Sequence, residues 1–389
     1  MVDPLGWIDD EAAEWSRRGL ARRLTAHGPS APGQIAIGDR TLINFGANDY
    51  LGLAADPRVV AAARTAAEAY GWGAAASPLV TGWSFEHQAL AESLAAFERT
   101  EAVALFPTGF AANLGAIAAL VGSGDAVYSD RVNHACLIDG ARLSGARLRV
   151  YPHGDAGRLE AILERDRGRF RRSLIATDGV FSMDGDLAPL DRLADLAERF
   201  GAMLLVDEAH GTGVFGPDGR GAASEHGVAD RVPIKVGTLS KALGSVGGFV
   251  AGSRRLIDWL INHSRTLIYS TSLPPAAASA ARAALAIAQA EPWRRDRVRA
   301  LGETLRDALR QAGFDVGRSA SPIVPVLLGE PERAVVLAER LRERGLNVPA
   351  IRPPTVPSGA SRLRISLSAA HRDEDVAALV SALRADTEK

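Results

Sequence analysis

The fold is decided by Ala202-Met-Leu-Leu-Val-Asp-Glu-Ala-His210 and, after a turn-rich interval, Val232-Pro-Ile-Lys-Val-Gly-Thr-Leu-Ser-Lys241. Each stretch is a short apolar run that ends in polar residues, which is typical of a buried strand and its exit. In a parallel α/β sheet, ligands bind at the carboxyl ends of the strands. The side chains of Asp207, His210 and Lys241 are therefore candidates for one binding site.

Outward from this stretch, short apolar runs alternate with helical segments. Strands are expected near Ala102, 126–128, 147–151, 173–177 and 202–206. Helices are expected near 56–70, 84–98, 109–120, 133–143, 157–165, 190–200 and 276–289. This alternation predicts a mostly parallel sheet that is covered by helices on both faces.

The two ends of the chain have different patterns. Apolar spacing predicts a helix over 5–27, and a hairpin with a Gly-Asp turn follows at 34–45. In the last hundred residues, helices are expected near 293–312 and 331–345, with strands near 323–328 and 362–367. The predicted division is an N-terminal arm (1–47), a large domain (48–285) and a smaller C-terminal α/β domain (286–389).

Composition excludes several classes of function. The chain has 389 residues, a net charge of −1 and no basic run, so neither nucleic acid nor a membrane surface is an expected partner. No apolar run of about eighteen residues suggests a membrane span, and the acidic N-terminus does not resemble a secretory signal. A single cysteine, Cys136, permits no internal disulfide. These features favour a protein of a reducing compartment, the cytoplasm.

Lys241 lies just past an apolar run, among small and hydroxyl residues, and a Gly-Gly pair leads into the next run at Phe249. Desolvation lowers the pKa of an amine and frees its lone pair to attack a carbonyl, as a Schiff-base lysine must. Taken alone, the lysine fits a surface position on a glycine-rich loop better. Its neighbours in the predicted fold decide between these two interpretations.

Other strand exits offer complementary groups. Gly109 and Phe110 open a helix after a strand, where backbone N–H groups bind phosphate, although a plain helix start is an equal alternative. His134 either stacks on a planar ring or is a buried, hydrogen-bonded histidine. Asp207 is placed to face a cationic ring nitrogen or to cap the following turn. Ser182 adds a hydroxyl, and the eight histidines lack metal-ligand spacing, so no metal site is expected.

One motif points elsewhere. Gly211-Thr-Gly-Val-Phe-Gly216 is formally a GxGxxG, the mark of a nicotinamide oxidoreductase. That fingerprint must open a helix, with an acidic residue about twenty positions later. Here the turn-forming Pro217-Asp-Gly follows, and Arg231 occupies the later position. Because Ser240 precedes Lys241, the lysine is not part of a phosphate-binding P-loop either.

Together, the phosphate-binding turn, the histidine, the carboxylate and the lysine match the needs of pyridoxal phosphate. The motifs Asp207-Glu-Ala-His-Gly-Thr-Gly213 and Thr238-Leu-Ser-Lys-Ala-Leu-Gly244 also resemble those of the α-oxoamine synthases, and the likeness extends from Asn48 to His371. These are fold-type I pyridoxal-phosphate enzymes with an aspartate aminotransferase-like fold. The resemblance implies a mostly parallel seven-stranded sheet in the large domain and a homodimer whose active sites lie at the interface.

The resemblance also implies a role for each matching residue. Lys241 would hold the cofactor and move a Cα proton, Asp207 would pair with the ring nitrogen, and His134 would stack on the ring. The other cofactor contacts would be made by Gly109, Phe110, Ser182, His210 and Thr238, and by Ser270 or Thr271 towards the partner subunit's cofactor. Substrates would be bound by Arg22, Asn48, Thr355 and Arg364, with Arg364 on the amino-acid carboxylate.

Within the family, Tyr269-Ser-Thr-Ser-Leu-Pro-Pro275 and Ile351-Arg-Pro-Pro-Thr-Val-Pro357 are similar to the branch of biotin biosynthesis. That branch condenses L-alanine with a pimeloyl thioester, carried by CoA or by acyl carrier protein, and releases CO2. The alternative is a sister enzyme that uses glycine and a short acyl-CoA. Pro78 after Ser77 departs from the usual family pattern, which leaves the conformation of that loop open.

Overall fold

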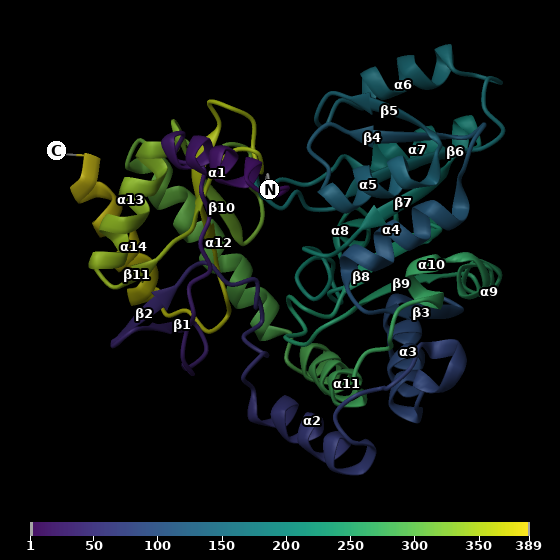
Figure 1. Ribbon diagram of the computed structural model, residues 1–389, viewed down its shortest axis with the longest axis horizontal. Coiled ribbons are helices and arrows are strands. Elements are labelled where there is room, and N and C mark those ends of the chain that lie inside the picture. Colours follow the sequence, from purple (N-terminus) through teal and green to yellow (C-terminus); the bar gives the residue numbers. More distant parts are fainter. Residues whose placement is uncertain (1–2, 388–389) are drawn as a thin grey trace. The chain divides into compact units, whose positions relative to one another are not determined.

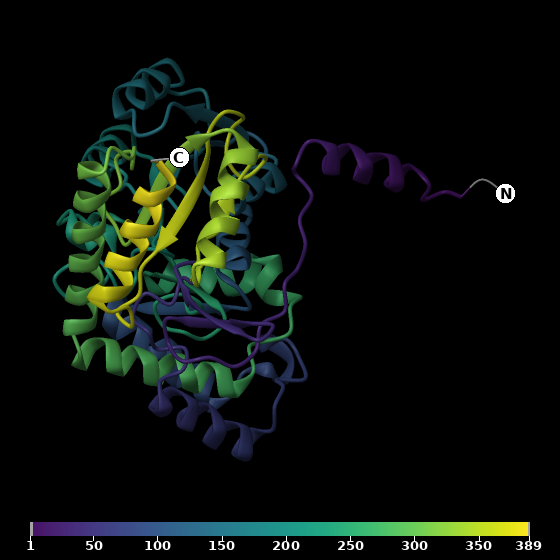
Figure 2. The same ribbon diagram turned by 90° about the vertical axis from the view of Figure 1, so that its left-hand side faces the viewer.

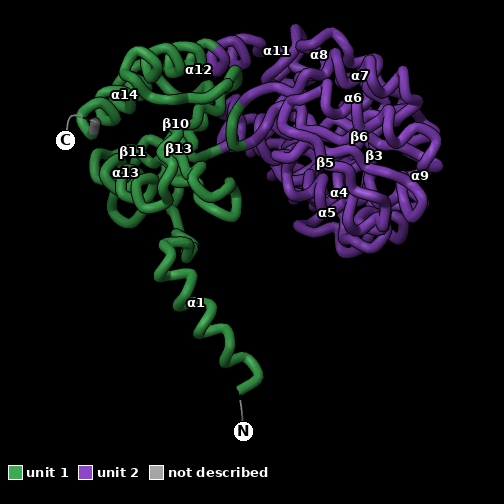
Figure 3. The backbone as a smooth tube through the Cα atoms, turned by 90° about the horizontal axis from the view of Figure 1, so that it is seen from above, with its two compact units in different colours: residues 1–47, 183–185, 300–389 green, residues 48–182, 186–299 purple. Residues whose placement is uncertain are grey.

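The computed structural model describes residues 3–387, and the chain divides into two compact units (Figure 3). One unit contains residues 48–182 and 186–299 and is called the large unit below. The other contains residues 1–47, 183–185 and 300–389 and is called the terminal unit. The three-part division at residues 47 and 285 remains a prediction.

The large unit contains a seven-stranded sheet with the strand order β3-β9-β8-β7-β6-β4-β5 (Figure 1). Strands β4 to β8 run parallel, while β9 pairs antiparallel with both β3 and β8. The expected mostly parallel, seven-stranded sheet is therefore confirmed. The strands are β3 (Ala102–Phe106), β4 (Ala126–Asp130), β5 (Arg147–Tyr151), β6 (Ser173–Asp178), β7 (Met203–Asp207), β8 (Ile234–Thr238) and β9 (Gly248–Gly252).

Helices precede, separate and follow these strands along the chain. They are α2 (Pro57–Tyr70), α3 (Phe85–Glu98), α4 (Gly109–Leu120), α5 (Ala135–Ser144), α6 (Ala156–Arg165), α7 (Leu190–Phe200), α8 (Ala222–Glu225), α9 (Arg254–His263), α10 (Arg265–Ile268) and α11 (Pro275–Ala290). Strands β4, β8 and β9 are buried along their whole length, as expected for strands covered on both faces. The core packs apolar strand residues against α4, α5 and α9.

Glycine allows one helix start to lie directly on the sheet. A Cβ at Gly248, the first residue of β9, would lie 2.5 Å from the Cα of Gly109, the first residue of α4. Only a glycine therefore permits this approach of the two backbones. The Thr108 hydroxyl caps α4 by accepting a hydrogen bond from the Ala111 N–H, which fixes the start of the helix.

The terminal unit contains two small sheets, ordered β1-β2-β11 and β10-β13-β12. Its elements are α1 (Trp7–Arg17), β1 (Gln34–Ile37), β2 (Arg40–Asn44), β10 (Ile323–Gly329), α13 (Pro331–Glu343), β11 (Leu346–Asn347), β12 (Ala350–Ile351), β13 (Ser361–Ser366) and α14 (Asp373–Thr387). Helix α12 (Trp293–Gln311) contains the boundary between the units. The β1–β2 hairpin is antiparallel, as expected from its Gly-Asp turn.

The N-terminal helix is shorter than expected. The sequence pattern predicted a helix over 5–27, but α1 ends at Arg17 and the next segment is extended (Figure 2). Gly19 has a φ of +64°, a conformation that ends right-handed helices, and helical order is not resumed after it. The Arg352 side chain donates to the Gly19 carbonyl and so holds the extended segment instead.

None of the helices within residues 3–387 combines the length and the apolar character that crossing a membrane would require.

Candidate active site

A cavity of about 200 Å³ lies at the carboxyl ends of β6, β7 and β8, beside the starts of α4 and α5. Seven of the residues predicted for the cofactor site line it: Gly109, Phe110, His134, Asp207, His210, Thr238 and Lys241. They come from segments spread over more than a hundred positions of sequence. The prediction that strand exits converge on one site is thus confirmed as geometry, while the chemical role of each residue remains a prediction.

The lysine end of the cavity is a short chain of side chains. Lys241 Nζ lies 2.7 Å from Nε2 of His210, and the other ring nitrogen, Nδ1, lies 2.6 Å from the Tyr50 hydroxyl. The turn that carries Lys241 is closed by a hydrogen bond from the Gly244 N–H to the Lys241 carbonyl. The amine therefore faces a buried polar group in the cavity rather than bulk water, which favours the interpretation as a functional lysine.

The carboxylate end is held by neutral donors. Asp207, 4% exposed, accepts hydrogen bonds from the Asn113 amide at 2.7 Å and from the Ala209 N–H at 2.8 Å. Within residues 3–387, Asp207 makes no ion pair with a lysine, arginine or histidine. Its carboxylate lines the cavity and is held there by neutral donors, so a cationic group of a ligand would be favoured beside it.

His134 also lines the cavity and caps α5 with its ring nitrogen Nδ1. Its backbone N–H donates to Asp178 at 2.7 Å, which fixes the position of the residue. Burial and the neighbouring Asp207 raise the pKa of Asp178 well above its usual range. His134 is exposed as a residue and lines the cavity, which favours ring stacking over the alternative of a buried core histidine. A ring at this place can stack on a planar ligand.

Hydroxyl and N–H groups form the remaining wall. In the first turn of α4, the N–H groups of Gly109 and Phe110 have no acceptor within the helix, because their hydrogen-bond partners would precede its start. The Thr238 hydroxyl, 2.8 Å from Ser240 Oγ, lies beside Gly109. The helix dipole adds a partial positive charge at this place. This wall is suited to a phosphate group.

The cavity therefore fits a phosphorylated pyridine aldehyde by the chemistry of its donors. Free helix N–H groups match a phosphate, a buried carboxylate held by neutral donors matches a protonated ring nitrogen, and an amine matches an aldehyde. Burial and the adjacent Asp207 raise the pKa of Cys136, which also lines the cavity. This thiol stays protonated and does not compete with the lysine as a nucleophile.

The GxGxxG segment serves a structural purpose. Residues 211–216 form turns, and the only helix that follows closely is the four-residue α8. A Cβ at Gly211 or Gly221 would lie 2.1 or 2.4 Å from the carboxylate of Glu208, which accepts hydrogen bonds from the first N–H groups of α8. These glycines make room for a buried helix cap, which argues against dinucleotide binding.

Three predicted cofactor residues do not line this cavity. Ser182 follows β6 in a turn, and Ser270 and Thr271 lie between α10 and α11 beside Pro78 and Trp83. Pro78 opens a short turn of π-helix, and the Ser272 N–H donates to the Ala76 carbonyl at 3.0 Å. The unusual proline therefore belongs to a loop that is fastened to the segment of Ser270 and Thr271.

The predicted substrate residues are divided between the units. Asn48 is in the large unit, where its side chain accepts a hydrogen bond from the Tyr50 hydroxyl at 3.3 Å. In the terminal unit, Arg22 donates to the Thr355 hydroxyl at 3.3 Å. Arg364, on β13, is 5% exposed and donates to the Ser366 hydroxyl at 2.6 Å. Their roles in substrate binding remain predictions.

Sequence reasoning missed Asn113, Asp178 and Tyr50 as members of the site. Asn113 follows Gly109 by four positions on α4, a spacing that places both on one helix face, so its approach to the cavity was open to prediction. Asp178 ends a strand next to β7 and could have been found by the same rule that found Asp207. Tyr50 had no such signal, because its contact with His210 spans 160 residues.

A mostly parallel seven-stranded sheet with a lysine, a carboxylate and a free helix start at its carboxyl edge defines a fold-type I transferase of the pyridoxal-phosphate class. The family model "Aminotransferase class I and II" matches residues 40–383, and the chain belongs to this family. The resemblance drawn from the motifs at 207–213 and 238–244 is thereby confirmed.

Relatives and solved structures agree with this assignment. The chain is 51% identical over 381 residues to an 8-amino-7-oxononanoate synthase of Anaeromyxobacter dehalogenans (strain 2CP-1 / ATCC BAA-258), covering 98% of this chain and 95% of the relative. It is 50% identical over 351 residues to the same-named protein of Methylococcus capsulatus (strain ATCC 33009 / NCIMB 11132 / Bath), covering 90% of each. A serine palmitoyltransferase variant from S. paucimobilis, solved with a bound PLP–myriocin aldimine, superimposes with a TM-score of 0.93 at 30% identity, covering 100% of this chain and 99% of that one.

Proposed function

We propose that this enzyme condenses L-alanine with a pimeloyl thioester and releases CO2 and the free carrier thiol, giving 8-amino-7-oxononanoate for biotin biosynthesis. Its cofactor is pyridoxal 5′-phosphate. The observation that carries the proposal is the cavity in which Lys241, Asp207 and His134 meet the free N–H groups of α4. The relatives at 50–51% identity, which bear the name of this activity, support the choice of reaction.

When bound, pyridoxal phosphate supplies an electron sink for the bonds at the amino-acid α-carbon. The chain supplies the rest. Lys241 anchors the cofactor and moves the α-proton of alanine, for which its amine must lose a proton. Asp207 would hold the ring nitrogen and favour its protonated form, and His134 would stack on the ring. Further contacts are proposed for Ser182 and His210 on the phenolic oxygen, and for Gly109, Phe110 and Thr238 near the phosphate.

Substrate binding is assigned to four residues. The guanidinium of Arg364 is suited to hold the alanine carboxylate by two parallel hydrogen bonds. Asn48 and Thr355 are proposed to line the amino-acid pocket, and Arg22 to contact the acyl substrate. Because Arg364 is buried beside a hydroxyl, its side chain is already ordered and loses little entropy on binding.

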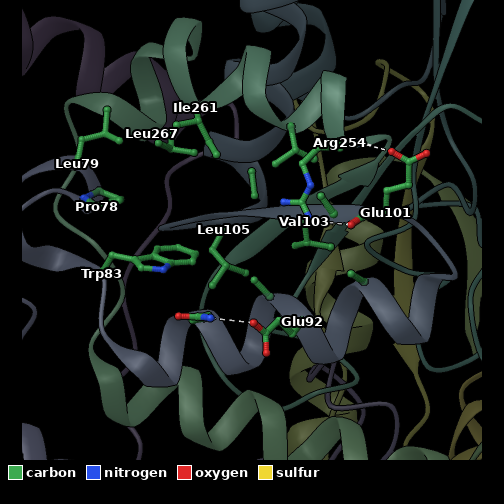
Figure 4. Close-up of a pocket in the computed structure, with 16 residues that line it drawn as sticks. Pro78, Leu79, Trp83, Glu92, Glu101, Val103, Leu105, Arg254, Ile261 and Leu267 are labelled. Carbon is green, nitrogen blue, oxygen red and sulfur yellow. Dashed lines mark hydrogen bonds between the residues drawn. The ribbon is translucent and has the colours of Figure 1, made fainter.

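We also propose a cytoplasmic homodimer in which Ser270 or Thr271 reaches the phosphate of the partner subunit's cofactor. A second copy is the proposed cover for a groove of about 730 Å³ in the large unit, lined by η1 (Pro78–Gly82), α3, β3 and α9 (Figure 4). Pro78 and Trp83 line this groove and also the small cavity that contains Ser270 and Thr271, so the two features are continuous.

The exposed apolar residues near this groove support that interface. Leu79, Val80 and Tyr269 are 55%, 74% and 70% exposed, which is more than a monomer surface usually tolerates in one place. Substituting Leu79→Asp should shift the mass measured by light scattering from that of a dimer towards that of a monomer. A monomeric wild-type protein, or a variant that stays dimeric, would contradict this face as the interface.

The reaction is tested by a product assay. Purified enzyme is incubated with L-alanine or glycine, each with pimeloyl-CoA and with pimeloyl-loaded acyl carrier protein, and the products are identified by mass spectrometry. Alanine with one of the two pimeloyl donors should give 8-amino-7-oxononanoate. Faster turnover with glycine would instead assign the sister reaction. The protein should be yellow and lose its colour with borohydride, whereas a nicotinamide enzyme would remain colourless when pyridoxal phosphate is added.

A further inference from the structure

Behind the proposed cofactor lysine, three side chains form a continuous hydrogen-bonded chain in the large unit. Lys241 Nζ is 2.7 Å from His210 Nε2, His210 Nδ1 is 2.6 Å from the Tyr50 hydroxyl, and that hydroxyl is 3.3 Å from Asn48 Oδ1. His210 and Tyr50 are 7% and 1% exposed. The proposed reaction assigns roles to Lys241, His210 and Asn48, but none to Tyr50.

Both ends of the Tyr50–His210 contact are fixed by the backbone. The Tyr50 N–H donates to the Asn48 carbonyl, and the Asp49 carboxylate accepts from the Leu53 N–H at 2.8 Å, which closes the turn around Tyr50. On the other side, the Gly211 N–H donates to the Glu208 carbonyl, two residues before His210. These bonds fix the backbone on either side of the contact, and both side chains are buried. The fold therefore holds the Tyr50 hydroxyl next to His210 Nδ1.

The protonation state of Lys241 decides which nitrogen of His210 carries a proton, and therefore what Tyr50 must do. A lysine ammonium has only donors, so beside it His210 Nε2 must accept and Nδ1 must carry the proton. A neutral lysine amine can accept instead, which permits the opposite tautomer of His210. The group bonded to Nδ1 must therefore accept a hydrogen bond when the lysine is charged and donate one when the lysine is neutral. A tyrosine hydroxyl does both, whereas a carbonyl or an amide N–H does only one.

We propose that Tyr50 is a positioning residue that sets the tautomer of His210 and, through it, the proton affinity of Lys241. By accepting from Nδ1–H, the Tyr50 hydroxyl stabilises the tautomer that pairs with the lysine ammonium. Removing the hydroxyl destabilises this charged arrangement most, because hydrogen bonds to charged groups are the stronger ones. The inference rests on the proposed role of Lys241 as the cofactor lysine, and it adds a residue that adjusts when that lysine gives up its proton.

Other titratable groups face the same amine. They are His210, His134, Asp178, Asp207 and Cys136, from the ends of β6 and β7 and the start of α5. None of them is altered by Tyr50→Phe, which keeps the ring and its packing. A change in the titration of Lys241 in this variant therefore reports the hydroxyl itself.

The test uses the full-length, cofactor-free protein, so that it does not depend on the proposed reaction. Amine labelling of Lys241 is followed by peptide mass spectrometry from pH 6 to pH 11, and the midpoint of rate against pH is read. Tyr50→Phe should lower this midpoint by about one pH unit, the size expected from one hydrogen bond to a charged chain. Tyr151→Phe removes a hydroxyl from an equally buried tyrosine outside the cavity and should leave the midpoint unchanged.

A second measurement needs no variant. In wild-type protein with ¹⁵N-labelled histidine, the nitrogen shifts of His210 below the labelling midpoint should report a proton on Nδ1, and above it the opposite tautomer. An unmoved midpoint in Tyr50→Phe, or a proton on Nε2 below the wild-type midpoint, would overturn the inference. Failure of the proposed reaction is seen separately, as no colour on addition of pyridoxal phosphate and no product from alanine.

Discussion

Two groups of buried carboxylates in the large unit are built in opposite ways. At the end of β7, Asp207 receives hydrogen bonds from the neutral Asn113 amide and the Ala209 N–H. At the end of β4, Asp130 is 3.1 Å from His153 Nδ1, and His153 Nε2 is 2.9 Å from Asp186. Burial alone would lower the pKa of His153, but the hydrogen bonds to both carboxylates outweigh it and raise the pKa to about 9. The chain thus places a charged partner in direct contact with the second group, whereas Asp207 is held by neutral donors.

The difference distinguishes a structural site from a binding site. A buried carboxylate costs free energy unless a charge partner compensates it. In the cluster of Asp130, His153 and Asp186, folding itself provides the partner. At Asp207 the direct partners are neutral, and the protonated ring nitrogen of pyridoxal phosphate would provide a charged one. Substitutions in the cavity should therefore change activity more than stability, and substitutions in the histidine cluster the reverse.

The largest effect is expected for Lys241→Ala. Without its amine the enzyme would lose both the proposed cofactor anchor and the group proposed to move the alanine α-proton, so turnover should fall to background. The free energy of unfolding of the cofactor-free protein should hardly change, because Lys241 lies at the cavity and not in the core. Product formation and urea unfolding measure the two quantities. Turnover that survives would assign the proton transfer to another group.

Asp207→Asn should come next. The variant keeps the size of the side chain but removes its charge, and the ring nitrogen then holds its proton less well. Loss of one preorganised electrostatic group typically lowers kcat on the order of 10²- to 10³-fold. The control is His153→Gln, which disturbs the other group of carboxylates and should change kcat far less. Equal losses in both variants would show that the two groups do not differ in the way described.

For the free energy of unfolding the order is reversed, and His153→Gln should have a larger effect than Asp207→Asn. A histidine whose pKa is raised by folding contributes stability that is complete below its unfolded pKa of about 6.5. That contribution is lost as pH rises through the folded pKa of about 9. The substitution should therefore cost about 1–3 kcal/mol at pH 6 and little at pH 10, as measured by urea unfolding.

The difference between wild type and His153→Gln isolates the histidine. Burial also raises the pKa of Glu98 to about 8 and that of Glu208 to about 7, but both residues are present in the two proteins. Their titration therefore cancels in the comparison. A stability difference that stays constant from pH 6 to pH 10 would contradict the assignment of a charged His153.

The fold and the residues at the strand ends that line the cavity could be predicted from the sequence for a physical reason. Buried parallel strands appear as short apolar runs, and the residues that end them must lie at one edge of the sheet. This rule found Asp207, His210 and Lys241 from local pattern alone. Recognising the family added the number of strands in the sheet, seven, which local pattern does not contain.

What could not be predicted depends on contacts between distant segments. The bond from Asn113 to Asp207 joins positions 94 apart, and no local pattern selects this amide over another. The helix expected over 5–27 ended at Arg17 because Gly19 takes a positive φ, which a glycine permits but does not require. His153 was overlooked since its partners, Asp130 at the end of β4 and Asp186 in the loop between β6 and α7, are 23 and 33 positions away in sequence.

The smallest effect is expected for Asn113→Ala, which tests how Asp207 is held rather than what it does. The carboxylate keeps its charge and the hydrogen bond from the Ala209 N–H, but loses the amide that orients its other oxygen. A hydrogen bond to a charged group is worth about 1.5 kcal/mol at the low end of its range, so kcat should fall by about tenfold. Asn262→Ala, at an exposed amide on α9, is the matched control and should have no effect on kcat. A loss as large as that of Asp207→Asn would mean that Asn113 acts on the cofactor or substrate directly, and that the neutral donors are part of the chemistry and not only of its support.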